Sequence, residues 1–206
     1  MSAVSPFQFP LIAILRGLTP DDALDHVGAL AEAGYDAIEI PLNSPRWADS
    51  IGAAVQAFGQ RCWIGGGTVL KIADVDVLAD LGARFIVTPN TRPPVIRHAV
   101  ARGLQVVAGF ATATEAFDAL DAGAQMLKLF PAATYGPGHL RALRAVLPPT
   151  VPLFVVGGVS TDTLHDYLAA GATGAGIGGE LYRPGQALAQ TRAQAAAFRQ
   201  AYLDHA

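Results

Sequence analysis

Cysteine, lysine and clustered metal ligands are scarce in this chain, and each shortage excludes a class of structure. The single cysteine, Cys62, cannot form an internal disulfide. The five histidines have no metal-ligand spacing, so we expect no metal site and place them on helix surfaces: His26, His98, His139, His165 and His205. A formal net charge of −3, with dispersed arginines, leaves no basic stripe for nucleic acid. We therefore expect a small-molecule ligand and no cofactor.

Long hydrophobic runs are also missing. No uninterrupted apolar stretch approaches the ~18 residues of a membrane span, and the initial MSAVSPFQFP lacks a basic start followed by a long apolar run. We expect a cytoplasmic protein with no membrane partner. An apolar content of 51% in 206 residues is enough to bury one large core. The chain is therefore predicted to be a single domain over residues 1–206.

What the sequence does contain is a repeated joint between a helix and a strand. An Ala-rich helical end, a glycine and an apolar strand follow one another in AEAGYDAIEI, ADLGARFIVT, VARGLQVVAG, LDAGAQMLKL and LAAGATGAGI. The joint glycines are placed to end a helix in the left-handed conformation that glycine adopts at low cost: Gly34, Gly82, Gly103, Gly123 and Gly171. Three further apolar runs, PLIAILRG, RCWIGGGT and VPLFVVGG, bring the expected strands to eight.

Eight apolar strands alternating with helices predict a parallel sheet covered by helices. The length fits the compact end of the (β/α)8 TIM barrel, and the alternative is a doubly wound open sheet. The even repeat and the polar residues at the strand ends favour the barrel. Barrel enzymes carry their function at the carboxyl ends of the strands.

Lys128 stands in the middle of the apolar run QMLKLF and is one of only two lysines, the other being Lys71. Strand side chains alternate, so Leu127 and Leu129 should face the helices while Lys128 points into the barrel. The same parity in YDAIEIPL directs Glu39 inward. A purely structural buried ion pair is one interpretation of these two charges.

The alternative interpretation is imine chemistry. Apolar surroundings lower the pKa of a lysine, and a neutral amine attacks a ketone to form a Schiff base. A nearby carboxylate such as Glu39 could then move the protons that imine formation and carbon–carbon cleavage require. Asp36, at the start of its strand, does not fit that task, and Glu115 and Asp118 are expected to be solvated on a helix.

Paired glycines follow the last two expected strands. VVGGVSTD and GIGGELYR offer backbone N–H groups beside helix starts, an arrangement that binds phosphate in many barrels, although glycine could also serve only for tight turns. The stretch GAGIGG also matches the dinucleotide pattern G-x-G-x-x-G. It lies at the last strand, with no later strand to supply a ribose-binding acid, so we reject a dinucleotide site.

The ordered set LIAILRG, IEIPLNSP, GGGTV, FIVTPN, MLKLFPA and VVGGV resembles the class I aldolases of 2-dehydro-3-deoxy-6-phosphosugar acids, from about Pro10 to Tyr182. The resemblance implies a (β/α)8 barrel, commonly a homotrimer, that cleaves a six-carbon phosphorylated keto sugar acid to pyruvate and glyceraldehyde 3-phosphate. It implies that Lys128 forms the Schiff base and Glu39 shuttles protons. The remaining implied residues are Arg16, Thr68, Pro89 and Phe130 around pyruvate, Val156 at the substrate, and Gly157, Gly158, Gly178 and Gly179 at the phosphate.

Departures within these motifs bear on the substrate. The gluconate-type enzymes of the family usually read EVTLRTP where this chain has EIPLNSP, and Thr-Gly-Gly where it has Val156-Gly157-Gly158. Both departures resemble the galactonate type, so we expect the 6-phosphogalactonate derivative as substrate. The alternatives are a gluconate-type or dual-epimer aldolase and, from another class, a catalytically silent phosphosugar-binding barrel. Gly179 stands where many relatives place a phosphate-binding serine.

Overall fold

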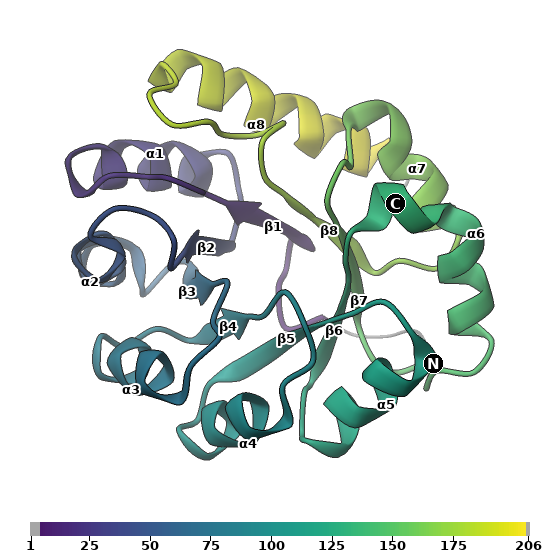
Figure 1. The fold of residues 1–206 in the computed structure, drawn as a ribbon. Helices are drawn as coiled ribbons and strands as arrows, with labels where there is room; N and C mark the ends of the chain where they lie inside the picture. Colours follow the sequence, from purple (N-terminus) through teal and green to yellow (C-terminus); the bar gives the residue numbers. More distant parts are fainter. Residues whose placement is uncertain (1–4, 205–206) are drawn as a thin grey trace.

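Apolar runs and joint glycines alternate along the chain. The computed structural model describes residues 5–204. In it the apolar runs are the strands of a closed parallel barrel. Each strand pairs with the next in the sequence, and β8 pairs with β1 (Figure 1). The barrel is therefore confirmed and the open sheet is excluded. The strands are β1 Leu11–Ile14, β2 Ala37–Pro41, β3 Trp63–Gly67, β4 Phe85–Val87, β5 Gln105–Phe110, β6 Met126–Leu129, β7 Leu153–Val156 and β8 Gly174–Ile177.

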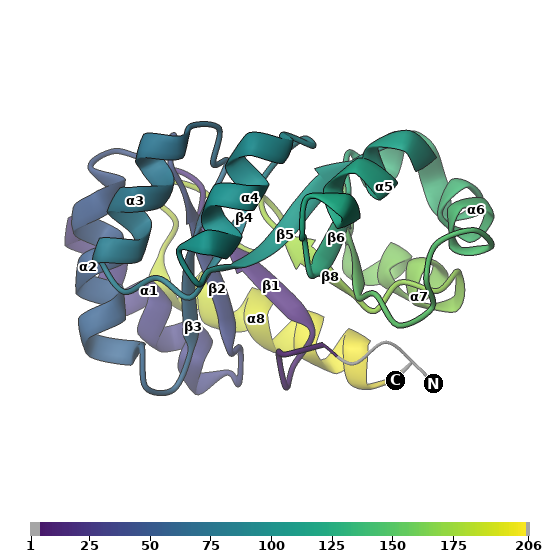
Figure 2. The same cartoon turned by 90° about the horizontal axis from the view of Figure 1, so that it is seen from below.

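Helices follow the strands and form the outer layer, which flanks the strands on both sides in the perpendicular view of Figure 2. The five joint glycines all have positive φ, between 78° and 101°, as the sequence predicts. Glycine reaches this conformation without the steric cost of a Cβ atom. The helices are α1 Pro20–Glu32, α2 Trp47–Phe58, α3 Ile72–Asp80, α4 Pro93–Ala101, α5 Ala113–Asp121, α6 Ala132–Arg144, α7 Thr161–Ala169 and α8 Leu188–Leu203.

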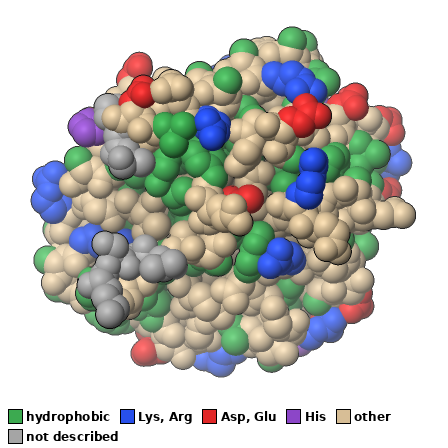
Figure 3. Space-filling view, turned by 180° about the vertical axis from the view of Figure 1, so that it is seen from behind, with side chains coloured by type: hydrophobic (Ala, Val, Ile, Leu, Met, Phe, Trp, Pro, Cys, Tyr) green, Lys and Arg blue, Asp and Glu red, His purple; other side chains and the backbone are tan. Residues whose placement is uncertain are grey.

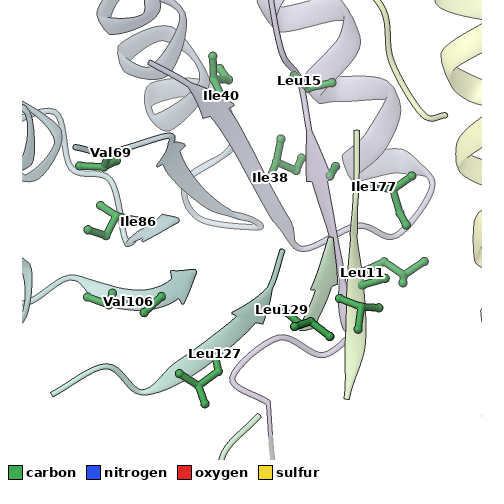
Figure 4. Packing of buried hydrophobic residues seen from close by; sticks show 14 of the residues in the cluster. Leu11, Leu15, Ile38, Ile40, Val69, Ile86, Val106, Leu127, Leu129 and Ile177 are labelled. Atoms are coloured by element: carbon green, nitrogen blue, oxygen red, sulfur yellow. The ribbon is translucent and has the colours of Figure 1, made fainter. Parts of the chain in front are cut away.

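The two faces of strands β1 to β7 contact two different apolar clusters. Outward-facing side chains, among them Ile38, Ile40, Leu127 and Leu129, belong to the large cluster between barrel and helices (Figure 4). A smaller cluster fills the barrel interior and includes Met126. The predicted parity of β2 and β6 is thus confirmed, and it leaves Glu39 and Lys128 on the interior face.

An aromatic floor, which we define as Phe7, Trp63, Phe85 and Phe154, closes the amino-terminal end of the interior. The ring of Phe7 lies 5.4–5.8 Å from the other three ring centroids. Its segment is held by Asp36, whose carboxylate accepts the backbone N–H groups of Gln8 at 2.7 Å and Phe9 at 3.2 Å. Asp36 therefore anchors the floor. It directly precedes β2, at the end of the barrel away from the carboxyl ends of the strands.

One histidine contradicts the expectation of surface histidines. His26 on α1 is buried, 5% exposed, and its Nδ1 lies 2.9 Å from Oγ1 of Thr191 on α8. Its ring also packs edge-on against Tyr182. The prediction was wrong because this contact joins residues 165 positions apart, which no local pattern reveals. His205 lies outside the described residues.

Charged groups on the face in Figure 3 are mixed, with basic and acidic side chains scattered among apolar ones. Ion pairs on the surface, such as that between Arg192 and Glu32, join opposite charges of neighbouring helices. Within residues 5–204, no helix combines the length and the apolar character needed to cross a membrane.

Candidate active site

Lys128 and Glu39 meet in the barrel interior, as the strand parity predicts. Lys128 is 6% exposed on β6 and Glu39 is 2% exposed on β2. Burial lowers the pKa of Lys128 to about 8 and raises the pKa of Glu39 to about 7, and each charge partly opposes the shift of the other. A substantial fraction of the amine is therefore neutral, and nucleophilic, slightly above neutral pH.

The two groups do not form a contact ion pair. Among the ion pairs of residues 5–204 none joins Lys128 to Glu39, and the buried Oε2 of Glu39 has no hydrogen-bond partner. A buried carboxylate oxygen without a partner is costly, and in a native protein it calls for an explanation. The geometry therefore does not show a direct ion pair that stabilises the packing, and Oε2 of Glu39 keeps an unused hydrogen-bond acceptor.

A cavity of about 550 Å³ opens above this pair at the carboxyl ends of the strands. All nine non-catalytic residues that the resemblance implies line it: Arg16, Thr68, Pro89, Phe130, Val156, Gly157, Gly158, Gly178 and Gly179. They come from the ends of six different strands, so only barrel closure brings them together. The volume suits a small organic ligand.

Arg16 supplies a guanidinium to this cavity from the end of β1. Its Nη1 donates a 2.9 Å hydrogen bond to Oδ1 of Asn43, which follows β2. The same positive charge acts on the pKa of both buried groups, lowering that of Glu39 and of Lys128. The side chain itself is exposed, so its charge is available to an anionic group in the cavity.

The loop after β4 is drawn inward over the barrel. The Oγ1 of Thr88 donates to the carbonyl of Asn90 at 2.8 Å and accepts the backbone N–H of Gly109 at 3.1 Å. A Cβ atom on Gly109 would overlap the backbone of Pro89, so this strand can carry only glycine there. These contacts place Pro89 on the cavity wall. After the neighbouring strand β3, Thr68 adopts a left-handed backbone conformation, with φ of 56°, which is uncommon outside glycine.

Phe130 covers the amine from the cavity side. The Nζ of Lys128 lies 4.7 Å from the centroid of its ring, a distance at which an aromatic face attracts a cation. The ring is 36% exposed and would also contact a ligand attached to the amine.

The paired glycines form the remaining side of the cavity. Within residues 5–204, no protein acceptor takes the backbone N–H of Gly157, Gly158, Gly178 or Gly179. Unpaired N–H groups beside a cavity are suited to an anion. α7 begins shortly afterwards, at Thr161, with Ser160 and Thr163 forming a capping box.

The expected helix start directly after Gly178 and Gly179 was wrong. A single turn follows there, in which Leu181 and Tyr182 donate their N–H groups to the carbonyl of Gly178, and α8 begins only at Leu188. The second glycine pair thus offers backbone N–H groups without the N-terminus of a long helix.

Comparison with known proteins matches residues 7–196 to the model of the KDPG and KHG aldolase family. The chain belongs to this family. It is 56% identical, over 96% of both chains, to 2-dehydro-3-deoxy-6-phosphogalactonate aldolase of Escherichia coli strain K12. It is 49% identical, over 96% of this chain and 93% of the other, to the probable enzyme of the same name in Rhizobium meliloti strain 1021.

Solved structures agree with the family. One described as the native KDPGal structure superposes with a TM-score of 0.96 at 54% identity, covering 100% of this chain and 98% of that chain. A cube-shaped protein cage, designed by fusing symmetric oligomeric domains, matches with a TM-score of 0.95 at 56% identity, over 96% of this chain and 73% of the other. As a member of this family, the protein is an aldolase-type lyase.

Four residues of the cavity wall escaped the sequence analysis: Ile14, Val159, Gly176 and Glu180. Ile14, Val159 and Gly176 are apolar members of strands or loops and resemble ordinary core positions in the sequence. Glu180 is a carboxylate beside the glycines, and Arg183, 3.5 Å away, partly offsets its charge. Only the strand-end position could have marked these residues.

A larger groove, of about 770 Å³, lies at the other end of the barrel, between the segment before β1 and the segments before β7 and β8. Its guanidinium, Arg144, already donates to the carbonyls of Gly171 and Val151 and to Oγ1 of Thr173. The smaller cavity, in contrast, is lined by Phe130, whose ring centroid lies 4.7 Å from Nζ of Lys128.

Proposed function

We propose that this protein is a class I aldolase that cleaves 2-dehydro-3-deoxy-6-phosphogalactonate to pyruvate and glyceraldehyde 3-phosphate. The observation that carries the proposal is the buried Lys128, with its lowered pKa, near the unpartnered carboxylate of Glu39 and beneath the cavity at the carboxyl ends of the strands. Family membership supports the same reaction class.

In the proposed reaction, the neutral Lys128 amine attacks the C2 ketone of the substrate and the ketone oxygen leaves as water. The resulting iminium withdraws electrons from the C3–C4 bond. Glu39 takes the proton of the C4 hydroxyl, whose oxygen becomes the carbonyl of the departing aldehyde, while the bonding pair remains on C3 as an enamine. Protonation of C3 and hydrolysis of the imine then release pyruvate and restore the amine.

The cavity residues would hold the two ends of the substrate. Arg16, positioned by Asn43, is suited to the carboxylate next to the ketone, and Thr68, Pro89 and Phe130 enclose the pyruvyl portion. The four glycine N–H groups would bind the phosphate at the far end. Gly179 would contribute its backbone alone, without the hydroxyl of a serine.

The galactonate epimer is favoured over the gluconate epimer by two observations. The relatives named for the galactonate reaction are 56% and 49% identical to this chain, whereas two named for the gluconate reaction are 31% and 35% identical. Val156, which lines the cavity, provides an apolar wall that cannot hydrogen-bond a hydroxyl. Such a wall affects epimers that differ at C4 unequally.

A homotrimer is part of the proposal, supported by the family resemblance and by the similarity to a domain used as a symmetric oligomer in a designed cage. Light scattering of the purified protein would give the mass of the assembly directly. A cytoplasmic location stays a prediction.

Two measurements test the function: the cleavage rates of the two C4 epimers, and the covalent trapping of pyruvate on Lys128. Retro-aldol cleavage of both C4 epimers should be measured under identical conditions, and the galactonate derivative should be cleaved faster. Borohydride reduction in the presence of pyruvate should add one pyruvyl group at Lys128, found by peptide mass spectrometry. Absence of an adduct would favour the silent phosphosugar-binding barrel, and faster cleavage of the gluconate epimer would reassign the substrate.

A further inference from the structure

The three consecutive glycines of β3 serve three different neighbours. Gly65 lies opposite Glu39 in the β2–β3 register, and Gly67 lies opposite Pro41. By strand alternation Gly65 and Gly67 face the barrel interior, and Gly66 faces the helices. The interior face of β3 therefore carries no side chain at either position, which leaves room for side chains from the strands on both sides.

The space beside Gly65 is filled from β4. A Cβ atom on Gly65 would lie 2.5 Å from the carbonyl oxygen of Phe85 and 2.6 Å from its ring. On the opposite face, a Cβ atom on Gly66 would lie 2.7 Å from both methyl carbons of Leu78 and 2.9 Å from Leu42. Both glycines thus allow close packing of apolar groups.

The space beside Gly67 is filled by Glu39. The three atoms nearest to a Cβ atom built on Gly67 are Oε2, Cδ and Oε1 of Glu39, and all three would overlap it. We call this space the Gly67 slot. Gly67 is not among the glycines with positive φ, so the backbone itself does not require glycine at this position.

We propose that Gly67 is a positioning residue, whose missing side chain creates the slot that holds the Glu39 carboxylate at the reacting carbons. This inference rests on the proposed function, because it assigns to Gly67 a role in proton transfer by Glu39. Without the slot, the carboxyl group would have to rotate away from β3, since it is the mobile end of a flexible side chain. A misplacement of about 1 Å at a reacting group is enough to lower a rate about 10²-fold.

Four variants test the slot. In Gly67→Ala, cleavage should fall ~10²-fold or more, while borohydride trapping of pyruvate at Lys128 persists. Gly66→Ala is the matched control, because it adds the same methyl group one residue away on the other face. The three atoms nearest its Cβ are end carbons of Leu78 and Leu42, which can shift, so its cleavage rate should stay within about threefold of the parent.

Rescue distinguishes a positional defect from general damage. Glu39→Asp shortens the side chain by one carbon–carbon bond, about 1.5 Å, and withdraws the carboxylate from the added methyl group. The double variant Glu39→Asp/Gly67→Ala should therefore cleave faster than Gly67→Ala alone, although Glu39→Asp alone is slower than the parent. Such coupling is the mark of residues in contact. If the two losses simply multiply, or if Gly67→Ala cleaves as fast as Gly66→Ala, the inference is overturned.

A crystal structure of Gly67→Ala provides a readout that does not depend on catalytic activity, namely the position of the Glu39 carboxyl group. The carboxyl group of Glu39 should have left the slot, and an unmoved carboxyl group would overturn the inference even if the parent cleaved no phosphosugar acid. Should Gly67→Ala fail to fold, the double variant, which relieves the overlap, should fold, as shown by circular dichroism. If neither the parent protein nor Gly66→Ala cleaves the substrate, the proposed function itself is refuted.

Discussion

The two ends of the barrel interior differ in chemistry, because one is filled by aromatic rings and the other carries two buried ionisable groups. At the amino-terminal end, Phe7 packs against its three ring partners, and the Asp36 carboxylate accepts the backbone N–H groups of Gln8 and Phe9. At the carboxyl end, Lys128 and Glu39 are buried without a direct ion pair beneath an open cavity.

Strand β6 shows the change within two residues. Met126 and Lys128 point to the same side of the strand, and Met126 belongs to the apolar interior cluster while Lys128 reaches the cavity side. We infer that residues that stabilise the barrel and residues of the candidate site lie at opposite ends of the strands, and that one strand can contribute to both. Substitutions at one end should therefore affect folding, and substitutions at the other should affect turnover.

The largest effect is expected from Lys128→Met, which replaces the amine with an apolar side chain of similar length. Cleavage should be abolished, because no nucleophile remains to form the imine. The free energy of unfolding should stay equal or rise, since burial disfavours the ammonium. Turnover assays and denaturant titration check the two statements. A pyruvyl adduct that persisted at Lys71 would overturn the assignment of the nucleophile.

Glu39→Gln should lower cleavage by roughly 10² to 10⁴, the usual contribution of a positioned acid–base group. The amide has nearly the same shape, so circular dichroism should match the parent, and pyruvate should still be trapped on Lys128, more slowly. Near-parent turnover of the variant would mean that another group, or water alone, transfers the protons.

Phe7→Ala tests the floor. Truncating this buried ring should cost ~3 kcal/mol of stability and lower the melting temperature by roughly 10 °C. At a temperature where the variant is folded, pyruvate trapping on Lys128 should be unchanged. Phe117→Ala, which truncates a ring that is 40% exposed on α5, is the matched control and should melt close to the parent. A loss of trapping in folded Phe7→Ala would contradict the separation of the two ends.

Gly178→Ala tests the glycine side of the cavity with a smaller, selective effect. Its added methyl group would meet only Ile14, at 4.0 Å, and would otherwise occupy the cavity. Cleavage of the phosphorylated substrate should fall about tenfold, because binding energy from the remote phosphate helps to position the reacting carbons. Deuterium uptake into pyruvate should not change.

Gly138→Ala is the control for this substitution, since its methyl group would meet no atom within 4 Å and lies outside the cavity. Equal losses of cleavage and exchange in Gly178→Ala would mean that Gly178 is a structural turn and that the phosphate binds elsewhere.

The smallest effect concerns the titration of the amine. Acetic anhydride labels only a neutral amine, so labelling of Lys128 should rise through about pH 8 as the ammonium loses its proton. In Glu39→Gln the midpoint should move to lower pH, because the carboxylate that favours the charged form is gone. Peptide mass spectrometry measures the labelling, with the exposed Lys71 as reference in the same sample. An unchanged midpoint would mean that the two groups do not interact.

Local patterns in the sequence predicted the barrel and the direction of its two buried charges. Glycines such as Gly34 and Gly123 mark helix ends through their own backbone preference, and alternation fixed the faces of Glu39 and Lys128. These features depend on a few consecutive residues, so they can be predicted from the sequence without knowledge of the fold.

Features that depend on distant contacts could not be predicted. The residues next to His26 in the sequence do not indicate its partner Thr191 on α8. The residues next to Phe7 in the sequence do not indicate that its ring closes one end of the barrel. The slot beside Gly67 is likewise invisible in GGGT, because the group that needs it lies on another strand. The roles of the cavity residues came from resemblance, and their convergence on one cavity came from barrel closure.

The aromatic floor makes the barrel a dead end, so a molecule that binds Lys128 must enter and leave at the same end. With Phe7 and its partners across one end, a ligand on Lys128 has a single way out, through the cavity. In the proposed reaction, pyruvate is still bound covalently to Lys128 when the phosphorylated aldehyde departs through this opening. We therefore expect the aldehyde to leave first and pyruvate last, and in the reverse direction pyruvate to enter before its partner.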